Sequence, residues 1–121
     1  MGPILIVDDE FGIVDTIQDL LQDEGYRTQT AHNGRQAMDQ LTLERPRMVL
    51  LDDMMPVMDG TTLVLAMRQI PDLKDVPVVM MSANRQKPWH RQHCTAFLAK
   101  PFNLTELLAV IHRVTGPPSD R

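Results

Sequence analysis

Several residue types that mark particular classes of protein are scarce in this chain of 121 residues. Its single cysteine, Cys94, excludes a disulfide within the chain, and a reducing compartment fits best. No apolar run approaches the roughly 20 residues of a membrane-spanning helix. The first apolar run ends at Asp8, Asp9 and Glu10, which argues against a signal peptide. We therefore expect a cytoplasmic protein without a membrane segment.

Basic charge is also scarce. The chain has 12 Lys and Arg against 16 Asp and Glu, so a nucleic-acid-binding surface spread over the domain is not expected. Hydrophobic residues make up 43% of the chain, which excludes wholesale disorder. The length favours one domain. We assign it to residues 1–116, and we expect residues 117–121 to be a tail or the start of a linker.

Short apolar runs alternate with amphipathic stretches along the chain. The apolar runs predict buried strands at residues 4–7, 48–51, 78–81 and 96–99. Residues 27–31 predict a more polar strand, which suits an edge of the sheet. Apolar positions at helical spacing predict helices at about 11–24, 34–44, 60–70 and 104–115. Asn103 and Glu106 form a capping box at the start of the last one. The alternation predicts a doubly wound α/β domain with a five-stranded parallel sheet.

One segment breaks this alternation. Residues 84–93 lie where a fourth helix belongs, yet they contain Pro88 and one large apolar residue, Trp89. No apolar stripe of helical period can be drawn through them. We predict a shortened or irregular fourth helix, with Trp89 loosely packed.

Polar side chains follow four of the predicted strands, at the point where each strand ends. They are Asp8 and Asp9, Asp52, Ser82 and Lys100. The carboxyl ends of parallel strands share one edge of a sheet, and open α/β folds place their sites there. Three carboxylates, a hydroxyl and an ammonium gathered at that edge suit a divalent cation and a phosphoryl group.

The chain resembles the receiver domain of bacterial response regulators, the CheY-like domain of two-component systems. The resemblance covers almost the whole chain and rests on four motifs in order: Val7-Asp8-Asp9-Glu10, Leu50 to Gly60 with its Asp52-Asp53-Met54-Met55-Pro56 core, Met81-Ser82-Ala83, and Ala99-Lys100-Pro101-Phe102. It implies a flavodoxin-like sheet with strand order 2-1-3-4-5.

The resemblance also implies roles for the residues at the strand ends. Asp52 would be the phosphoacceptor. Asp9, Asp52 and the backbone carbonyl of Met54 would be direct ligands of Mg²⁺ (or Mn²⁺), and Asp8 would act mainly through a bound water. Oxygen ligands of this kind suit a hard octahedral cation.

Other residues of the motifs would handle the phosphoryl group and the response to it. By resemblance, Lys100, Ser82 and the backbone of Ala83 bind phosphoryl oxygens, and the Lys100–Pro101 bond is a candidate for the cis form. Ser82 and Phe97 match the positions of the family's conformational switch. A new hydrogen bond from Ser82 would bias an element that already has two arrangements.

The function implied is a phosphoacceptor signalling domain, which is regulatory rather than an enzyme although it contributes self-phosphorylation and self-dephosphorylation chemistry. A histidine kinase or a phosphotransfer protein would donate the phosphoryl group, and the downstream effector cannot be identified from the sequence. One alternative is a receiver-like interaction module that is not phosphorylated. A haloacid-dehalogenase-type phosphohydrolase is disfavoured, because Met54 stands where such enzymes place a second acidic residue.

The chain departs from the family pattern near the predicted fourth helix. Asp53 occupies a usually apolar position, and strand alternation predicts that its side chain points away from the site. We expect a solvated carboxylate at the end of the strand; the alternative is an extra negative charge that tunes metal affinity or the choice of partner. The interval from Ser82 to Lys100 is about one helical turn shorter than usual, and His93 replaces a typical glycine. We expect that the face around the fourth helix does not form the family's usual dimer. The four histidines show no metal-ligand spacing, and we expect them at the surface.

Overall fold

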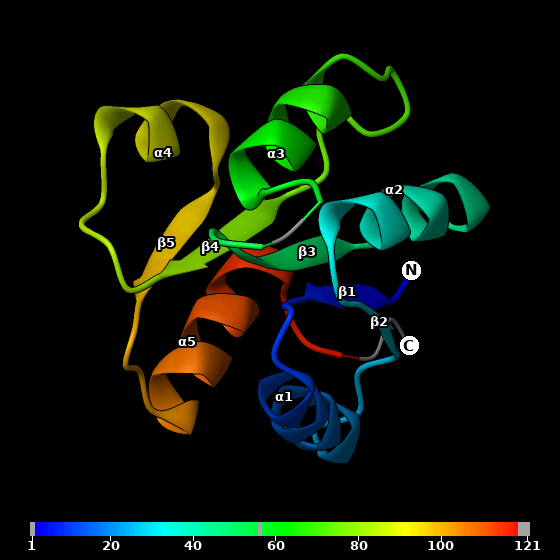
Figure 1. The fold of residues 1–121 in the computed structure, drawn as a ribbon. Helices are drawn as coiled ribbons and strands as arrows, with labels where there is room; N and C mark the ends of the chain where they lie inside the picture. The colour runs from blue at the N-terminus through cyan, green and yellow to red at the C-terminus, as the bar shows by residue number, and fades with distance from the viewer. Residues whose placement is uncertain (1, 56, 119–121) are drawn as a thin grey trace.

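The computed structural model describes residues 2–55 and 57–118, and in this part of the chain five parallel strands form one sheet in the order β2-β1-β3-β4-β5 (Figure 1). The strands are β1 (Ile4–Val7), β2 (Thr28–Ala31), β3 (Met48–Asp52), β4 (Val78–Ser82) and β5 (Ala96–Ala99). The helices are α1 (Phe11–Asp23), α2 (Gly34–Leu43), α3 (Gly60–Arg68), α4 (Pro88–His93) and α5 (Leu104–Thr115). The predicted fold class and strand order are confirmed, with the polar strand β2 at an edge. Pro56 of the second motif and residues 119–121 of the predicted tail lie outside the described residues.

Helices cover both faces of the sheet, with α1 and α5 on one face and α2, α3 and α4 on the other (Figure 1). Every residue of β1, β3 and β4 is buried. Alternate residues of β1 serve the two cores: Ile4 and Ile6 pack on the side of α1 and α5, and Leu5 and Val7 on the side of α2 and α3. Burial on both faces explains why these strands read as continuous apolar runs.

The helix boundaries follow from local signals in the sequence. Gly25 follows α1 with a φ of 100°, in the left-handed region where a side chain is strained. At the start of α5, Asn103 accepts a hydrogen bond from the Glu106 N–H, and Glu106 accepts one from the Asn103 N–H. This reciprocal pair is the predicted capping box. No described helix is both long and apolar enough to cross a membrane.

The fourth helix is short, as predicted. It has 6 residues, and only His90 in it is buried. His90 also caps the helix, because its ring Nδ1 accepts the Lys87 N–H at 2.9 Å. One buried side chain in six residues is why no apolar stripe could be drawn in the sequence.

Candidate functional site

The strand register brings the candidate residues to one edge of the sheet. β1 pairs along its full length with β3, from Ile4 beside Met48 to Val7 beside Leu51, so that the next residues, Asp8 and Asp52, are neighbours. On its other side β3 pairs with β4, and β4 pairs in turn with β5. Just beyond β5, the Lys100 N–H donates to the Ser82 carbonyl at 2.8 Å. Residues far apart in the sequence therefore meet at the carboxyl edge, as the sequence predicts.

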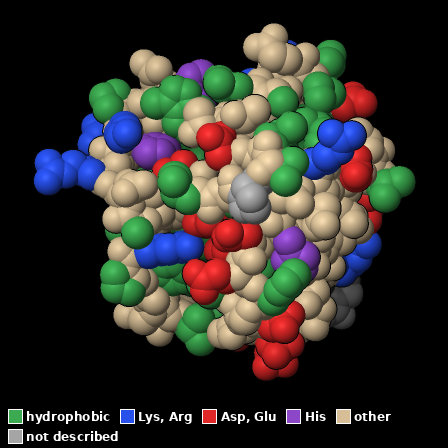
Figure 2. Space-filling model, in the orientation of Figure 1, with side chains coloured by type: hydrophobic (Ala, Val, Ile, Leu, Met, Phe, Trp, Pro, Cys, Tyr) green, Lys and Arg blue, Asp and Glu red, His purple; other side chains and the backbone are tan. Residues whose placement is uncertain are grey.

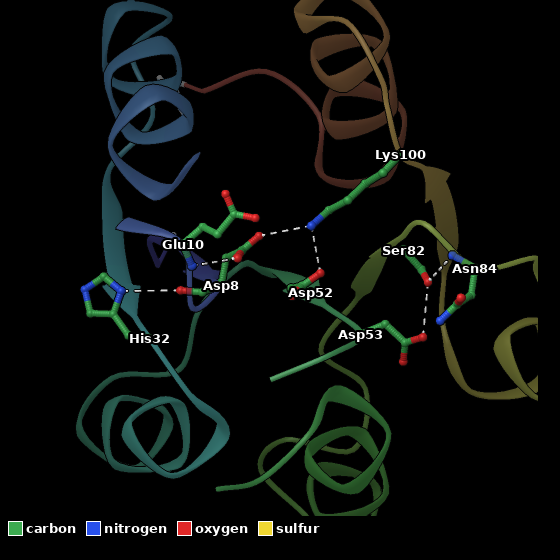
Figure 3. A network of polar contacts seen from close by, with 8 residues as sticks. All are labelled: Asp8, Glu10, His32, Asp52, Asp53, Ser82, Asn84 and Lys100. Carbon is green, nitrogen blue, oxygen red and sulfur yellow. Dashed lines mark hydrogen bonds and ion pairs between the residues drawn. The ribbon is translucent and has the colours of Figure 1, made fainter. Parts of the chain in front are cut away.

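The ammonium of Lys100 lies between two buried carboxylates (Figure 3). Its Nζ donates to Asp52 Oδ1 at 2.9 Å and to Asp8 Oδ2 at 3.4 Å. Asp8 is fully buried and Asp52 is 6% exposed. The peptide bond between Lys100 and Pro101 is cis, in agreement with the expectation from the resemblance. One ammonium beside two carboxylates leaves the pocket with an excess of negative charge.

A third carboxylate, that of Asp9, completes a group that we call the carboxylate cluster: Asp8, Asp9 and Asp52. One oxygen from each lies within 4.8 Å of the others. Asp9 is exposed, so the cluster is open to solvent on its side. The other oxygen of Asp8, Oδ1, accepts the Glu10 N–H at 3.0 Å. Carboxylate oxygens with access to water are the ligands that Mg²⁺ prefers, so the donor set fits this ion.

Burial and charge shift the titration of the central pair. Burial raises the pKa of Asp52 above its ordinary 3.8; the hydrogen bond from Lys100 lowers it in part, and the charge of Asp8 raises it again. Burial lowers the pKa of Lys100, but its hydrogen bond with Asp52 and its attraction to both carboxylates outweigh this and raise it above 10.5. Burial is thus the main reason why the pKa of Asp52 rises, whereas the pKa of Lys100 rises because the two carboxylates stabilise its charged form.

Ser82 is held by a residue that the sequence predicts to point elsewhere. Its hydroxyl donates to Asp53 Oδ2 at 3.2 Å and accepts the Asn84 N–H at 3.0 Å (Figure 3). Asp53 does point away from Asp52 and Lys100, as strand alternation requires. It is only half-buried, but it is not a free solvated carboxylate. That part of the prediction is wrong, because alternation gives the side of the sheet and not the contact made there.

Comparison with known proteins identifies the family. The family model described as the response regulator receiver domain matches residues 4–112. The chain belongs to the response regulator receiver family. It is 37% identical over 108 residues to sporulation initiation phosphotransferase F of Bacillus subtilis, and the match covers 86% of each protein. The chain spans about half the length of several other curated response regulators that it matches.

Solved structures agree with this assignment. The chemotaxis response regulator CheY4 of Vibrio cholerae matches with a TM-score of 0.88 and 34% identity, covering 94% of this chain and 98% of that one. A receiver domain from a sensor histidine kinase of Pseudomonas aeruginosa matches with a TM-score of 0.84 and 29% identity, covering 95% and 98%. That second structure holds a magnesium ion coordinated in its active site cleft.

Apolar side chains surround the charged centre of this receiver domain. Figure 2 shows acidic side chains near the middle of the face, with basic and hydrophobic side chains around them. Four large apolar residues at this edge are at least 43% exposed: Phe11, Met54, Val57 and Leu104. A groove of about 610 Å³ runs beside Lys100, between the first turns of α1 and the start of α5. We call Phe11, Met54, Val57 and Leu104 the apolar rim.

The predicted switch residue Phe97 lies in β5 against the short helix α4. Its ring is half-buried, and its centroid is 4.8 Å from that of His90. His90 itself is 4% exposed, so its predicted surface position is wrong. Trp89 packs edge-on to His90 and against the core beneath α3, rather than loosely. These errors share a cause, since a helix of 6 residues shows no periodicity from which burial could be predicted.

Sequence reasoning missed two residues that support the site. The His32 ring, half-buried beside Phe11, places Nδ1 3.3 Å from the Asp8 carbonyl. His32 follows strand β2, so the strand-end rule could have found it. Gly60 packs against the end of strand β3, where an added Cβ would lie 2.6 Å from the Asp52 carbonyl oxygen. The sequence predicts a helix that begins at residue 60, but it carries no signal for this close approach to β3.

Proposed function

We propose that Asp52 is the phosphoacceptor of this receiver domain. The observation that carries the proposal is the Asp52 carboxylate at the open edge of the sheet, 2.9 Å from the Lys100 ammonium and within the carboxylate cluster. A carboxylate flanked by a cation and further acidic ligands is suited to accept a phosphoryl group, because phosphoryl transfer depends mainly on positioning and on neutralising charge.

The transfer needs an ionised Asp52. One of its oxygens attacks phosphorus in line, and a P–O bond forms while the P–N bond of the phosphohistidine donor breaks. The donor's nitrogen keeps the electron pair and takes up a proton. Lys100, Ser82 and the Ala83 N–H would bind the oxygens of the transferred group. Lys100 also helps to keep Asp52 ionised, because its hydrogen bond lowers the carboxyl pKa against the effect of burial.

We propose that the carboxylate cluster and the backbone carbonyl of Met54 hold the cation, with Asp8 acting mainly through a bound water. When bound, Mg²⁺ neutralises charge on the transferring oxygens and on the cluster. Two observations support Mg²⁺: the all-oxygen donor set and the magnesium ion in the active site cleft of the Pseudomonas aeruginosa relative. Mn²⁺ is the second candidate, because it prefers similar ligands.

A protein donor fits the surroundings of Asp52. We propose a histidine kinase or a phosphotransfer protein, which places the domain in the cytoplasm. The apolar rim around the charged centre supports a protein partner, since apolar side chains clustered at one site mark interaction surfaces. We also propose that the domain takes the group from small phosphoryl donors and hydrolyses its own acyl phosphate. A response to the phosphoryl group would pass through Ser82 and Phe97.

The test is phosphorylation by a small donor. We expect phosphoramidate with Mg²⁺ to add one phosphoryl group to the wild type, measured by intact mass, and EDTA to prevent the addition. Asp52→Asn should give no adduct. Asp39→Asn, an exposed acidic residue on α2, is the matched control and should react like the wild type. A wild type without an adduct, or an adduct that persists in Asp52→Asn, would overturn the proposal.

A further inference from the structure

The hydroxyl of Ser82 has its single proton committed. A serine hydroxyl donates one hydrogen bond, and an ionised carboxylate can only accept. The proton of Ser82 Oγ therefore goes to Asp53 Oδ2 at 3.2 Å, while the oxygen accepts the Asn84 N–H at 3.0 Å. Ser82 is 1% exposed, so little water competes for these bonds. To donate to any other group, the hydroxyl must first leave Asp53.

The position of Asp53 is fixed by its backbone. Its N–H donates to the Met81 carbonyl at 2.9 Å, and its carbonyl accepts the Gly60 N–H at 3.1 Å. These bonds continue the β3–β4 ladder by one residue and tie the start of α3 to it. Because neighbours on a strand face opposite sides, Asp52 turns to Lys100 while Asp53 turns to Ser82 (Figure 3). The carboxylate of Asp53 is thus held where Ser82 can reach it.

We propose that Asp53 is a positioning residue that holds the Ser82 hydroxyl away from the phosphoryl site of the unphosphorylated domain. This inference rests on the proposed function, in which Asp52 carries the phosphoryl group and Ser82 binds one of its oxygens. Two anionic acceptors then compete for one hydroxyl proton: the carboxylate of Asp53 before transfer and the phosphoryl group after it. The bond to Asp53 therefore disfavours the state in which Ser82 faces the phosphoryl site, and phosphorylation must break that bond.

The competition predicts the effect of removing the acceptor. Asp53→Ala leaves the Ser82 hydroxyl free to turn toward the phosphoryl site. Loss of a hydrogen bond to a charged group corresponds to a roughly tenfold larger population of domains in which the hydroxyl faces that site. We therefore expect phosphorylation of Asp53→Ala by phosphoramidate to be roughly tenfold faster than that of the wild type. Asp53→Asn keeps the shape and a weaker neutral acceptor, so its rate should lie between the two.

A double-mutant cycle with Ser82→Ala separates this mechanism from simple electrostatics. Removing a negative charge near Asp52 could speed the reaction by itself, and that effect would persist when Ser82 is absent. If Asp53 acts through Ser82, the substitution of Asp53 changes the rate by less than about twofold in the Ser82→Ala background. The control Asp39→Asn removes an exposed charge on α2 and should change the rate in neither background.

The outcomes separate the inference from the function on which it rests. A wild type that is phosphorylated on Asp52, with equal rates for wild type and both Asp53 variants, overturns the inference and leaves the function in place. So does the same acceleration in both backgrounds. A wild type that takes no phosphoryl group overturns both. Circular dichroism of each variant verifies folding, and the isosteric Asp53→Asn keeps the test open if Asp53→Ala does not fold.

Discussion

The carboxylate cluster and the short helix α4 lie on the same domain but are held in place in different ways. Asp8 and Asp52 end or follow strands in which every residue is buried, and each strand is paired on both sides. Helix α4 has 6 residues and one buried side chain, and its neighbour β5 is an edge strand. The sheet fixes the positions of the carboxylates of Asp8 and Asp52, whereas the position of α4 depends on a few side-chain contacts.

This difference indicates how the two regions divide the work of a receiver domain. Isolated helices shorter than about 12 residues are marginal, so α4 depends on contacts with its surroundings. The side chain of His90 contributes three of these contacts: its ring Nδ1 accepts the Lys87 N–H, and the ring lies beside those of Phe97 and Trp89. Regions of low local stability are those that move in a switch. The cluster is suited to keep reacting groups in fixed positions, and α4 is suited to change its arrangement.

The largest expected effect comes from removing the ammonium group of Lys100, which lies beside the carboxylate cluster. Lys100→Met leaves the buried carboxylates of Asp8 and Asp52 without their ammonium, so we expect a loss of about 3 kcal/mol in the free energy of unfolding in EDTA. The unpaired Asp52 has a still higher pKa, and a carboxyl whose folded pKa exceeds its unfolded value loses stability as pH rises through that range. The deficit should therefore be greater at neutral pH than at pH 4.

Urea denaturation at several pH values measures this loss. Lys74→Met, which removes an exposed lysine in the loop before β4, is the matched control and should change stability by less than about 0.5 kcal/mol. Equal losses for the two variants would show that the cluster is not stabilised by Lys100.

The packing beneath the cluster gives the next largest effect. Gly60→Ala places a Cβ within 2.6 Å of the Asp52 carbonyl oxygen, so the loop must shift. We expect a loss of about 2 kcal/mol, typical of overpacking against backbone. The matched control is Gly12→Ala in α1, where an added Cβ meets nothing within 4 Å, and it should stabilise by about 0.5–1 kcal/mol. Thermal unfolding of the two variants in opposite directions would confirm the contrast.

A smaller global effect is expected in the α4 region. His90→Ala removes the cap and the ring against Phe97, so α4 should open locally while total stability falls by only about 1 kcal/mol. Amide hydrogen exchange at Cys94, whose N–H donates to the His90 carbonyl, should accelerate. Mg²⁺ affinity should stay unchanged. A loss of Mg²⁺ binding in this variant would contradict the separation of the two regions.

The smallest effect concerns pH and the cation. Protons and Mg²⁺ compete for Asp52, whose pKa lies above the ordinary 3.8 because of burial. Affinity should therefore weaken as the pH is lowered, beginning at a higher pH than for an ordinary carboxyl. NMR titration is expected to show Mg²⁺ shifts at Asp9 and Asp52 and little change at Trp89. Affinity that is independent of pH down to 3.8 would contradict the role of Asp52.

The two regions also differ in how far the sequence predicts them. Strand-end polarity placed Asp8, Asp52 and Lys100 correctly, because the ladder of a parallel sheet carries strand ends to one edge. The contact between Asp53 and Ser82 could not be predicted, since alternation fixes a side of the sheet but not the rotamer of a neighbouring strand's hydroxyl. The burial of His90 depends on tertiary packing around a helix too short to show a pattern.

The central claim is that Asp52 itself receives the phosphoryl group. Tandem mass spectrometry of peptides from the phosphoramidate-treated wild type, after borohydride reduction of the acyl phosphate to mark its carbon, tests this most directly. Our account predicts the mark on residue 52 and on no other acidic residue of the cluster. A mark on Asp8, Asp9 or Asp53 instead, or no marked peptide at all, would contradict it.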